Sequence, residues 1–378
     1  MPPVEIDSGA VRSAIPMVDL SPVLERAAAA IAANLRSMHH AGSYILGPQV
    51  RAFESELASS FGSLAAVGVG TGTAAIELAL RCEEICDRGK EVIVPALTSL
   101  FTAQAVLAAG ATPRFADVDP QTLLLDVESL ERAWTPRTAA VVAVHLYGQV
   151  CNLPALEEWC RQRRLVLVQD ACQAHGVRYQ GRPLTDFSPY AAYSFYPTKN
   201  LGCLGDGGAL LLGSQESAQK LSMLRDGGRR GDQTAVLPAI NSRLDEMHAC
   251  YLRALLPELD HWNRHRAAIA QLYDQLLSGC AHAIPVARRS DSVNHLYVVR
   301  TSCRDALRQH LAAHGIGTGI HYPAPLHQQP AFLHFHSSTS SLPHAESACR
   351  EILSLPLGPH IDAPAATSVA GCIRRFRP

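Results

Sequence analysis

Residues 165–213 read LVLVQDACQAHGVRYQGRPLTDFSPYAAYSFYPTKNLGCLGDGGALLLG, and this stretch decides the fold. It contains three short apolar runs, at residues 165–168, 191–195 and 209–212. Runs of this length that are bounded by Gly, Pro and Asp are typical of buried β-strands. The first run leads into Asp170, and Lys199 follows soon after the second. Because ligands bind at the carboxyl ends of the strands in an open α/β sheet, we expect both charged groups to lie in a ligand site.

The segments before this stretch alternate between strand and helix patterns. Apolar runs typical of strands lie at residues 65–69, 91–95, 113–118 and 139–145. Helix patterns lie at residues 19–38, 49–61, 74–81, 99–109, 127–133 and 153–163. This alternation is typical of a mostly parallel sheet with helices on both faces. We therefore predict an α/β fold.

The pattern changes after residue 213. Helices are expected at residues 215–225, 244–256 and 258–277, followed by a polar, strand-poor segment at 278–294. Strands are then expected at 295–300 and 318–321, and helices at 304–314, 343–350 and 363–374. At 378 residues the chain exceeds the size at which a single hydrophobic core usually stops growing. We expect a large domain at residues 1–260, including an N-terminal helical segment, and a small C-terminal α+β domain at residues 261–378.

Composition argues against several classes of protein. A net charge of −1 gives no reason to expect nucleic acid or an anionic membrane as a partner. No apolar run approaches the ~20 residues of a membrane span, and the N-terminus lacks the basic and apolar regions of a signal peptide. Eleven cysteines without CxxC pairs suit reduced thiols, so we expect a cytoplasmic protein. His39-His40 and His334-x-His336 stand apart from any cluster of cysteines or carboxylates, and no metal site is expected.

A second candidate ligand site lies near the N-terminus. The expected strand at 65–69 runs into Gly70-Thr71-Gly72-Thr73, and a helix follows. The free N–H groups and the positive dipole end of a helix start can bind phosphate. The dinucleotide fingerprint GxGxxG is incomplete, because Thr73 stands where it needs its third glycine. Taken alone, the segment fits a tight turn without a ligand equally well.

Lys199 taken alone allows three interpretations. It could form a structural ion pair or lie in a solvated loop. It could clamp a phosphate, but the GxxxxGK[ST] motif is missing. It could form a Schiff base with pyridoxal phosphate (PLP), with Asp170 keeping the pyridine nitrogen protonated. The third interpretation accounts for more of the sequence, because PLP needs an amine, an anion and phosphate donors, and Lys199, Asp170 and Gly72-Thr73 supply them.

The chain resembles the DegT/DnrJ/StrS-type sugar aminotransferases, a branch of the fold-type I PLP enzymes. The resemblance runs nearly end to end. Its motifs are IPMVDL at 15–20, YILG at 44–47, GTAA at 72–75, VHLYG at 144–148, DACQAHG at 170–176, SFYPTKN at 194–200, NSRLDE at 241–246, HYP at 321–323 and CREILSLP at 349–356. So many matches in order make the resemblance specific, although each motif alone would be weak.

The resemblance implies PLP, alternating with pyridoxamine phosphate (PMP), as the cofactor of the large domain. Lys199 would bind the cofactor's aldehyde and then shuttle the proton, and Asp170 would pair with the pyridine nitrogen. Gln173 would lie by the 3-oxygen. The phosphate would be bound by Gly72, Thr73 and Ser194. Each role agrees with the chemistry of its residue type, since hydroxyls offer neutral donors and glycine permits close approach of the backbone.

The resemblance also implies a homodimer with a shared site, in which Asn241 reaches the phosphate of the other subunit. Substrate contacts are expected from Arg243, His321 and Tyr322. The Arg229-Arg230 pair fits a pyrophosphate contact and a solvated turn equally well.

One position departs from the family pattern. Ser99 stands where the family usually places an aromatic ring over the cofactor. Phe101 could take that place through a shifted backbone, or it could be an ordinary core residue of the helix expected at 99–109. We expect the second.

The resemblance implies that the enzyme takes an amino group from glutamate or glutamine and passes it to a keto-sugar. The acceptor would be a nucleotide-linked 3-keto-6-deoxy sugar of amino-sugar or natural-product biosynthesis, because residues 199–208 resemble members that act at C-3. A 4-keto-sugar or a cyclitol (keto-inositol) is the alternative acceptor. Related PLP-dependent sugar dehydratases carry His at the position of Lys199, which favours transamination here.

Two other classes of function fit less well. A non-enzymatic regulator on the same fold would not need Lys199 beside Asp170 and Gln173. A nucleotide-binding oxidoreductase would need the third glycine of its fingerprint, and it would leave Lys199 without a role.

Overall fold

The computed structural model describes residues 14–231, 233–335 and 341–377. The helices are α1 (Ser21–Ala41), α2 (Pro48–Phe61), α3 (Gly72–Cys82), α4 (Leu100–Ala109), α5 (Val127–Ala133), α6 (Leu153–Arg163), α7 (Gln215–Leu224), α8 (Glu246–Leu255), α9 (Leu259–Leu277), α10 (Arg304–Ala313), α11 (Pro343–Glu351) and α12 (Ala363–Arg375). The strands are β1 (Ala65–Val69), β2 (Glu91–Pro95), β3 (Thr112–Ala116), β4 (Thr138–Val144), β5 (Val166–Asp170), β6 (Tyr190–Ser194), β7 (Gly208–Leu212), β8 (Ile284–Pro285), β9 (Tyr297–Arg300) and β10 (Ile352–Leu355). No helix in these ranges is long and apolar enough to cross a membrane.

A seven-stranded sheet forms the centre of the molecule, in the order β1-β7-β6-β5-β4-β2-β3. Strand β7 runs antiparallel to both of its neighbours, and every other pairing in the sheet is parallel. The carboxyl ends of β4, β5 and β6 therefore meet at one edge. Asp170 is the last residue of β5 and pairs in register with Val144 of β4 and Ala192 of β6.

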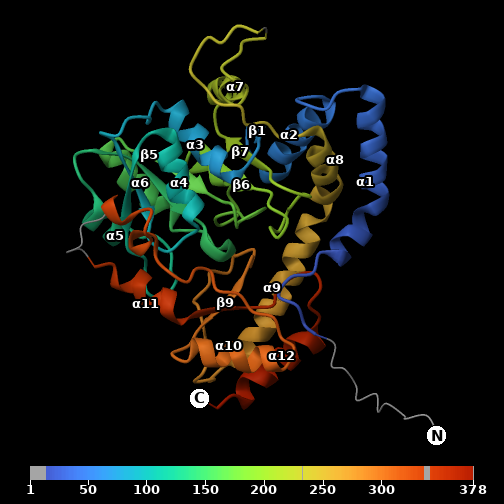
Figure 1. Cartoon of the computed structure of the whole chain (residues 1–378), viewed down its shortest axis with the longest axis vertical. Coiled ribbons are helices and arrows are strands. Elements are labelled where there is room, and N and C mark those ends of the chain that lie inside the picture. The colour runs from blue at the N-terminus through green and yellow to red at the C-terminus, as the bar shows by residue number, and fades with distance from the viewer. Residues whose placement is uncertain (1–13, 232, 336–340, 378) are drawn as a thin grey trace, which may run out of the picture.

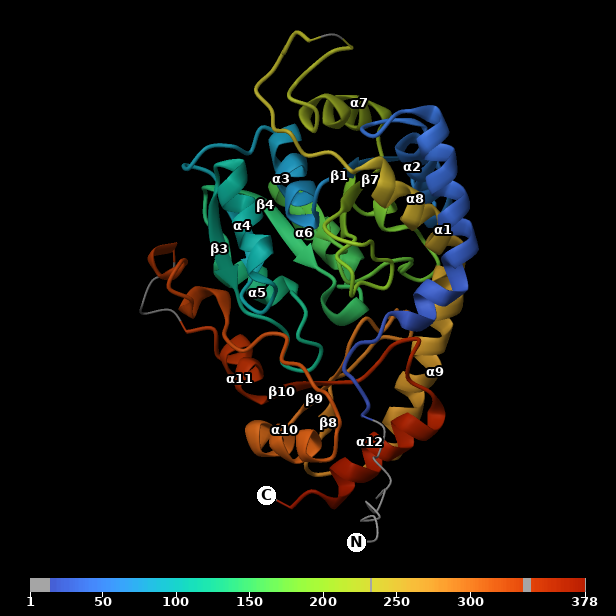
Figure 2. The same cartoon turned by 45° about the vertical axis from the view of Figure 1, so that its right-hand side comes forward.

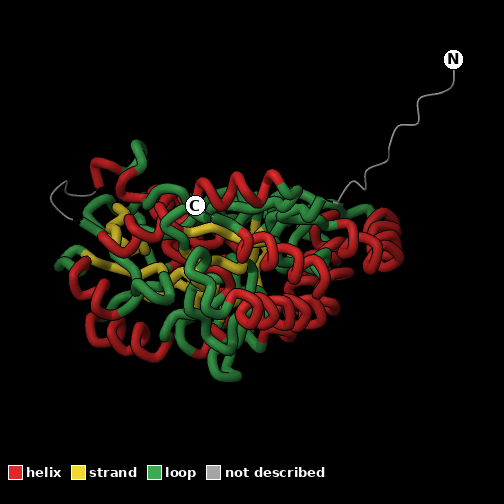
Figure 3. Tube along the Cα trace, turned by 90° about the horizontal axis from the view of Figure 1, so that it is seen from below, coloured by secondary structure: helices red, strands yellow, loops and turns green. Residues whose placement is uncertain are grey.

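Successive residues of the central strands pack into different cores. Tyr190 and Ala192 of β6 lie in a buried cluster with residues of α3 and α4. Ala191 and Tyr193 lie in a second cluster with residues of α2 and α8. This two-residue alternation is that of a strand buried on both faces. Seen from below, the strands lie between helices (Figure 3). The predicted α/β fold, mostly parallel with helices on both faces, is confirmed.

A smaller antiparallel sheet, in the order β10-β9-β8, lies in the C-terminal part of the chain. The strand expected at residues 318–321 does not form. This segment pairs with β10 only where Gly319 and Ser354 exchange two hydrogen bonds of 3.1 and 2.8 Å. Beyond Gly319 the contact with β10 continues only through side chains, since His321 Nδ1 hydrogen-bonds to Ser354 Oγ at 2.9 Å, while Tyr147 Oη and Gln173 Nε2 donate to His321 O and Tyr322 Oη.

Helix α9 passes from one core into another. It begins at Leu259, so the expected domain boundary after residue 260 lies in its first turn. Trp262 packs in the cluster that covers one face of the large sheet, whereas Ile269 and Tyr273 pack in the core of the small sheet. Figures 1 and 2 show this gold helix running from α8 down to α10 and α12.

Candidate active site

Asp170 lies at the carboxyl edge of the large sheet with both carboxylate oxygens hydrogen-bonded. Thr102 Oγ1 of α4 donates to Oδ2 at 2.8 Å, and the backbone N–H of Cys172 donates to Oδ1 at 3.2 Å. The residue is buried, with 6% of its surface exposed. Donors on both oxygens hold the carboxylate in one orientation at the sheet edge.

Lys199 lies in the tight loop that follows β6. Its N–H donates to Tyr196 O at 2.9 Å. The turn needs a glycine at position 202, because a Cβ there would lie 2.6 Å from Pro197 O and 2.7 Å from Tyr196 O. Burial lowers the pKa of the Lys199 amine from its ordinary 10.5, and the nearby Cys172 and Asp170 oppose this shift in part. The neutral amine, which is the nucleophilic form, is therefore more populated than in an exposed lysine.

The start of α3 is packed directly against the ends of the central strands. Thr71 caps the helix, since its Oγ1 accepts from the Ala74 N–H at 3.0 Å. A Cβ on Gly72 would lie 2.7 Å from both Cys172 Sγ and Ser194 Cβ, so only glycine fits there. The first N–H groups of a helix have no partner within it. The helix start can therefore present the N–H groups of Gly72 and Thr73, beside the Ser194 hydroxyl, to an anion.

Gln173 is held between the turn after β4, which contains Tyr147, and the segment that contains His321 and Tyr322. Its Oε1 accepts from the Tyr147 N–H at 2.7 Å, and its Nε2 donates to Tyr322 Oη at 3.2 Å. Tyr147 Oη in turn donates to His321 O at 2.5 Å. Burial raises the pKa of Tyr322 to about 12 and lowers that of His321 to about 4. Both side chains are therefore neutral at pH 7.

Two of the remaining predicted contacts, Asn241 and Arg243, flank Ser242, whose Oγ accepts from the Gly70 N–H at 3.0 Å in the turn before α3. Asn241 is exposed at the base of the loop formed by residues 227–231 and 233–240, which projects at the top of Figure 1. Arg243 Nη1 and Arg229 Nη2 both donate to Asp226 Oδ1, at 3.0 and 2.6 Å. Arg230 is exposed. Within the described residues, none of these side chains hydrogen-bonds to Asp170, Gln173 or Lys199.

The expectation that Phe101 is a core residue is wrong. Ser99 is the N-cap of α4, and Phe101 is the second residue of the helix, 59% exposed. The buried face of α4 carries Thr102, Ala103 and Val106 instead. Phe101 lies about 100° around the helix from Thr102, on the side away from Ala103, and that side faces the surface.

Two side chains of the site were not singled out from the sequence. Thr102 carries no local signal, because its partner Asp170 is 68 residues away. Tyr147 lies inside the VHLYG motif, and its positive φ of 61° at the end of β4 marks a special backbone position. Non-glycine residues rarely adopt this conformation, and it clusters at functional sites.

The arrangement fits PLP in its chemistry. An oriented carboxylate, a depressed-pKa amine and a helix start close to the same strand ends are the three partners that the cofactor needs. Several histidines around Lys199 are neutral, among them His175, whose pKa burial lowers to about 3. Within the described residues, Lys199 therefore lies close to imidazoles that carry no charge at pH 7.

Comparisons with known proteins agree on one family. The profile of the DegT/DnrJ/EryC1/StrS aminotransferase family matches residues 25–374. The chain is 44% identical over 364 residues to the dTDP-3-amino-3,4,6-trideoxy-α-D-glucose transaminase of Streptomyces venezuelae, and 96% of each chain is covered. Among solved structures, S. venezuelae DesV in complex with a ketimine intermediate matches with a TM-score of 0.92 at 44% identity, over 96% of this chain and 98% of that one. NtdA from Bacillus subtilis with bound PMP matches with a TM-score of 0.88 at 25% identity, over 96% and 86%.

Proposed function

Because the chain belongs to the DegT/DnrJ/EryC1/StrS aminotransferase family, we propose that it uses PLP to move an amino group from glutamate or glutamine to a nucleotide-linked keto-sugar. Transamination itself follows from the family and from the sugar transaminase to which the chain is 44% identical. The observation that carries the proposal is the meeting of Asp170, Lys199 and the start of α3 at one edge of the sheet.

In this proposal each side chain of the site has a separate role. PLP, when bound, supplies an aldehyde that accepts an amino group and a ring that takes up the electron pair of a broken C–H bond. Asp170 holds a proton on the ring nitrogen, and Thr102 keeps the carboxylate in place. Lys199 Nζ anchors the cofactor and, as a neutral amine, accepts and returns a proton. Gly72, Thr73 and Ser194 bind the phosphate, and Gln173 lies beside the ring.

The acceptor in this proposal is a 3-keto-6-deoxy sugar. The S. venezuelae relative is named for a product whose amino group is on C-3 of a trideoxy sugar, which supports a ketone at C-3 as the acceptor here. The 4-keto-sugar and the cyclitol ketone remain the alternative acceptors for the same site.

The proposed active unit is a homodimer. Asn241 is exposed and hydrogen-bonds to no predicted cofactor contact of its own chain, which supports a role in the partner subunit. Exposed apolar side chains on nearby segments, including Tyr44 and Met247, supply surface that association would cover.

A cofactor titration followed by a half-reaction screen tests the proposal. Adding PLP should produce an absorption band that is lost in Lys199→Ala, whereas binding of NAD(P) without a PLP adduct would contradict it. The protein is then loaded as PMP and offered a nucleotide-linked 3-keto sugar, its 4-keto isomer and a cyclitol ketone. The ketone that restores the aldehyde form of the cofactor identifies the acceptor. Failure of all three would reject the keto-sugar assignment.

A further inference from the structure

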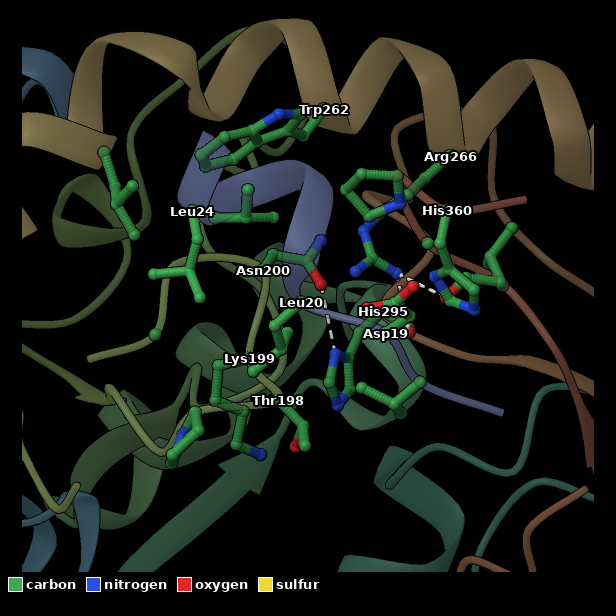
Figure 4. Close-up of a pocket in the computed structure, with 18 of the residues that line it drawn as sticks. Asp19, Leu20, Leu24, Thr198, Lys199, Asn200, Trp262, Arg266, His295 and His360 are labelled. Carbon is green, nitrogen blue, oxygen red and sulfur yellow. Dashed lines mark hydrogen bonds between the residues drawn. The ribbon is translucent and has the colours of Figure 1, made fainter. Parts of the chain in front are cut away.

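The histidines outside the proposed cofactor contacts differ in their surroundings. His295 and His360 line a cavity behind the Lys199 loop (Figure 4). There Nδ1 of His295 hydrogen-bonds to Asn200 Oδ1 at 3.0 Å, and the Arg266 guanidinium lines the same cavity. Because one buried cation repels another, this cavity is a poor place for a metal ion. The histidines at the end of α10 have no such neighbour in the described chain.

Two imidazoles and a thiol meet where α10 and α12 end. His310 lies in the last turn of α10, His314 is the C-cap residue of that helix, and Cys372 lies in the last turn of α12. One possible ligand atom from each side chain lies within 4.8 Å of the other two. Both helices pack in the core of the small sheet, where Figures 1 and 2 show them side by side. We call these three residues the α10–α12 cluster.

Hydrogen bonds to backbone carbonyls orient both imidazoles. His310 Nε2 donates to Cys372 O at 3.2 Å, and His314 Nδ1 donates to His310 O at 2.8 Å. Because a carbonyl oxygen only accepts, the bonded nitrogen carries the hydrogen, and the other nitrogen of the neutral ring keeps its lone pair. Histidines that bind zinc are oriented in this way, with the second ring N–H on a carbonyl, a carboxylate or a water. Each ring is thus held in a tautomer that leaves one nitrogen for a metal ion.

The helix ends favour a cation at the cluster. The carboxyl end of a helix carries partial negative charge, and the cluster lies at this end of both α10 and α12. The arginines that follow Cys372 in the sequence, Arg374, Arg375 and Arg377, oppose this effect. All three are exposed, so water and salt screen their charges.

We propose that the α10–α12 cluster binds Zn²⁺ through His310, His314 and Cys372. Imidazole and thiolate are the ligands that zinc prefers in proteins. Zinc bonds of about 2.0–2.3 Å place tetrahedral ligands about 3.3–3.6 Å apart. The ligand atoms therefore have to close from 4.8 Å by at most about 1.5 Å, and the exposed His314 side chain has room to move. Binding releases the Cys372 thiol proton to solvent, and a water molecule is the fourth ligand.

The bound ion would tie α12 to α10 and is independent of the proposed aminotransferase function. The expectation of no metal site rests on spacing along the sequence. Cys372 is 62 residues from His310, and only the packing of two helices brings them together. Spacing therefore could not indicate this cluster.

Zinc affinity, measured by competition with a coloured chelator, tests the inference on the full chain. The wild type should bind one Zn²⁺ per chain. Loss of residues that merely orient zinc ligands costs about 10- to 100-fold in affinity, so loss of a ligand in His314→Asn should cost at least about 100-fold. His261→Asn is the matched control and should bind as the wild type. His261 and His265 are also four residues apart on one helix, but no third ligand joins this pair within the described residues.

Cobalt identifies the thiol ligand. Co²⁺ bound in place of Zn²⁺ indicates the geometry and the ligands of the site through its absorption spectrum. The wild type should show thiolate-to-cobalt charge transfer, and Cys372→Ser should lose it. Cys303→Ser should keep it, because Cys303 is the N-cap residue at the opposite end of α10.

Zinc binding that is absent in the wild type, or equally tight in the wild type and His314→Asn, would overturn the inference. A wild-type cobalt spectrum without thiolate charge transfer would do the same. If Cys372→Ser fails to fold, His314→Asn still decides, because His314 is exposed and lies outside the core. Zn²⁺ should also raise the melting temperature of the wild type and of His261→Asn but not that of His314→Asn. An equal rise in all three proteins would place the zinc elsewhere and contradict the proposal.

Discussion

Thr102 Oγ1 donates a hydrogen bond of 2.8 Å to Asp170 Oδ2 and so links helix α4 to the carboxyl end of β5. With the Cys172 N–H on the other oxygen, the carboxylate has a donor on each side. The fold alone, without a ligand, therefore sets the orientation of the Asp170 carboxylate.

Replacing this hydroxyl should lower turnover while the protein stays folded. Thr102→Val keeps the shape of the side chain but removes the donor, and we expect kcat to fall about 10- to 100-fold, as for a lost hydrogen bond to a charged group. Thr102→Ser should recover most of the activity, because it restores the hydroxyl. Steady-state kinetics of the three proteins check this, with thermal melting as the folding control. If Thr102→Val and Thr102→Ser turn over at equal rates, the Thr102 hydroxyl has no role in the reaction.

A methyl group on Gly72 should weaken cofactor binding. The added Cβ would lie 2.7 Å from Cys172 Sγ and from Ser194 Cβ, which pushes the start of α3 away from the strand ends. Overpacking of this kind costs about 1–3 kcal/mol, so the Kd for PLP should rise about 5- to 150-fold in Gly72→Ala. Gly89→Ala is the control, because its nearest contact would be an ordinary 3.4 Å. The same Kd in both variants would contradict a phosphate site at Gly72.

Stability should fall as the pH drops below 6.5. Burial lowers the pKa of His175 to about 3 and those of His145 and His321 to about 4, from 6.5. The unfolded chain binds a proton at each histidine near pH 6.5, whereas the folded chain does so only near pH 3–4. Their contribution is thus complete above pH 6.5 and is lost on the way down to pH 4.

The size of this effect follows from proton linkage. One pH unit below 6.5 costs about 1.4 kcal/mol for each buried neutral histidine, which gives about 4 kcal/mol for three at pH 5.5. Urea unfolding at pH 7.5 and 5.5 measures the difference. His175→Gln should reduce it by about one third. A free energy of unfolding that does not change between the two pH values would mean that these histidines are accessible to protons in the folded state.

Mixed dimers should recover activity if the site is shared between subunits. Lys199→Ala and Asn241→Ala proteins are each expected to be nearly inactive. After random subunit exchange about half of the dimers are mixed, and each mixed dimer has one site with both residues intact. About one quarter of the wild-type activity should therefore return. If the mixture stays as inactive as its components, Asn241 does not act across the subunit interface.

Some parts of the site could be predicted from the sequence because they depend on local patterns. Apolar runs locate β5 and β6, and in a parallel sheet their ends place Asp170 and Lys199 at one edge. The glycine-rich turn likewise predicts a helix from residue 74, and α3 begins two residues earlier, at Gly72.

Other parts depend on packing between distant segments. The segment at 100–109 reads LFTAQAVLAA and is apolar nearly all round, so its spacing indicates no buried face. The sequence therefore could not show that Thr102 faces Asp170 and that Phe101 faces outward.

Helix α9 limits how the molecule can move. It carries Trp262 in one core and Tyr273 in another without interruption, and sharp kinks in helices need a cause such as proline or an inserted side chain, which α9 lacks between these residues. A change in the angle between these two cores would therefore have to bend α9 itself or take place in the chain on either side of it.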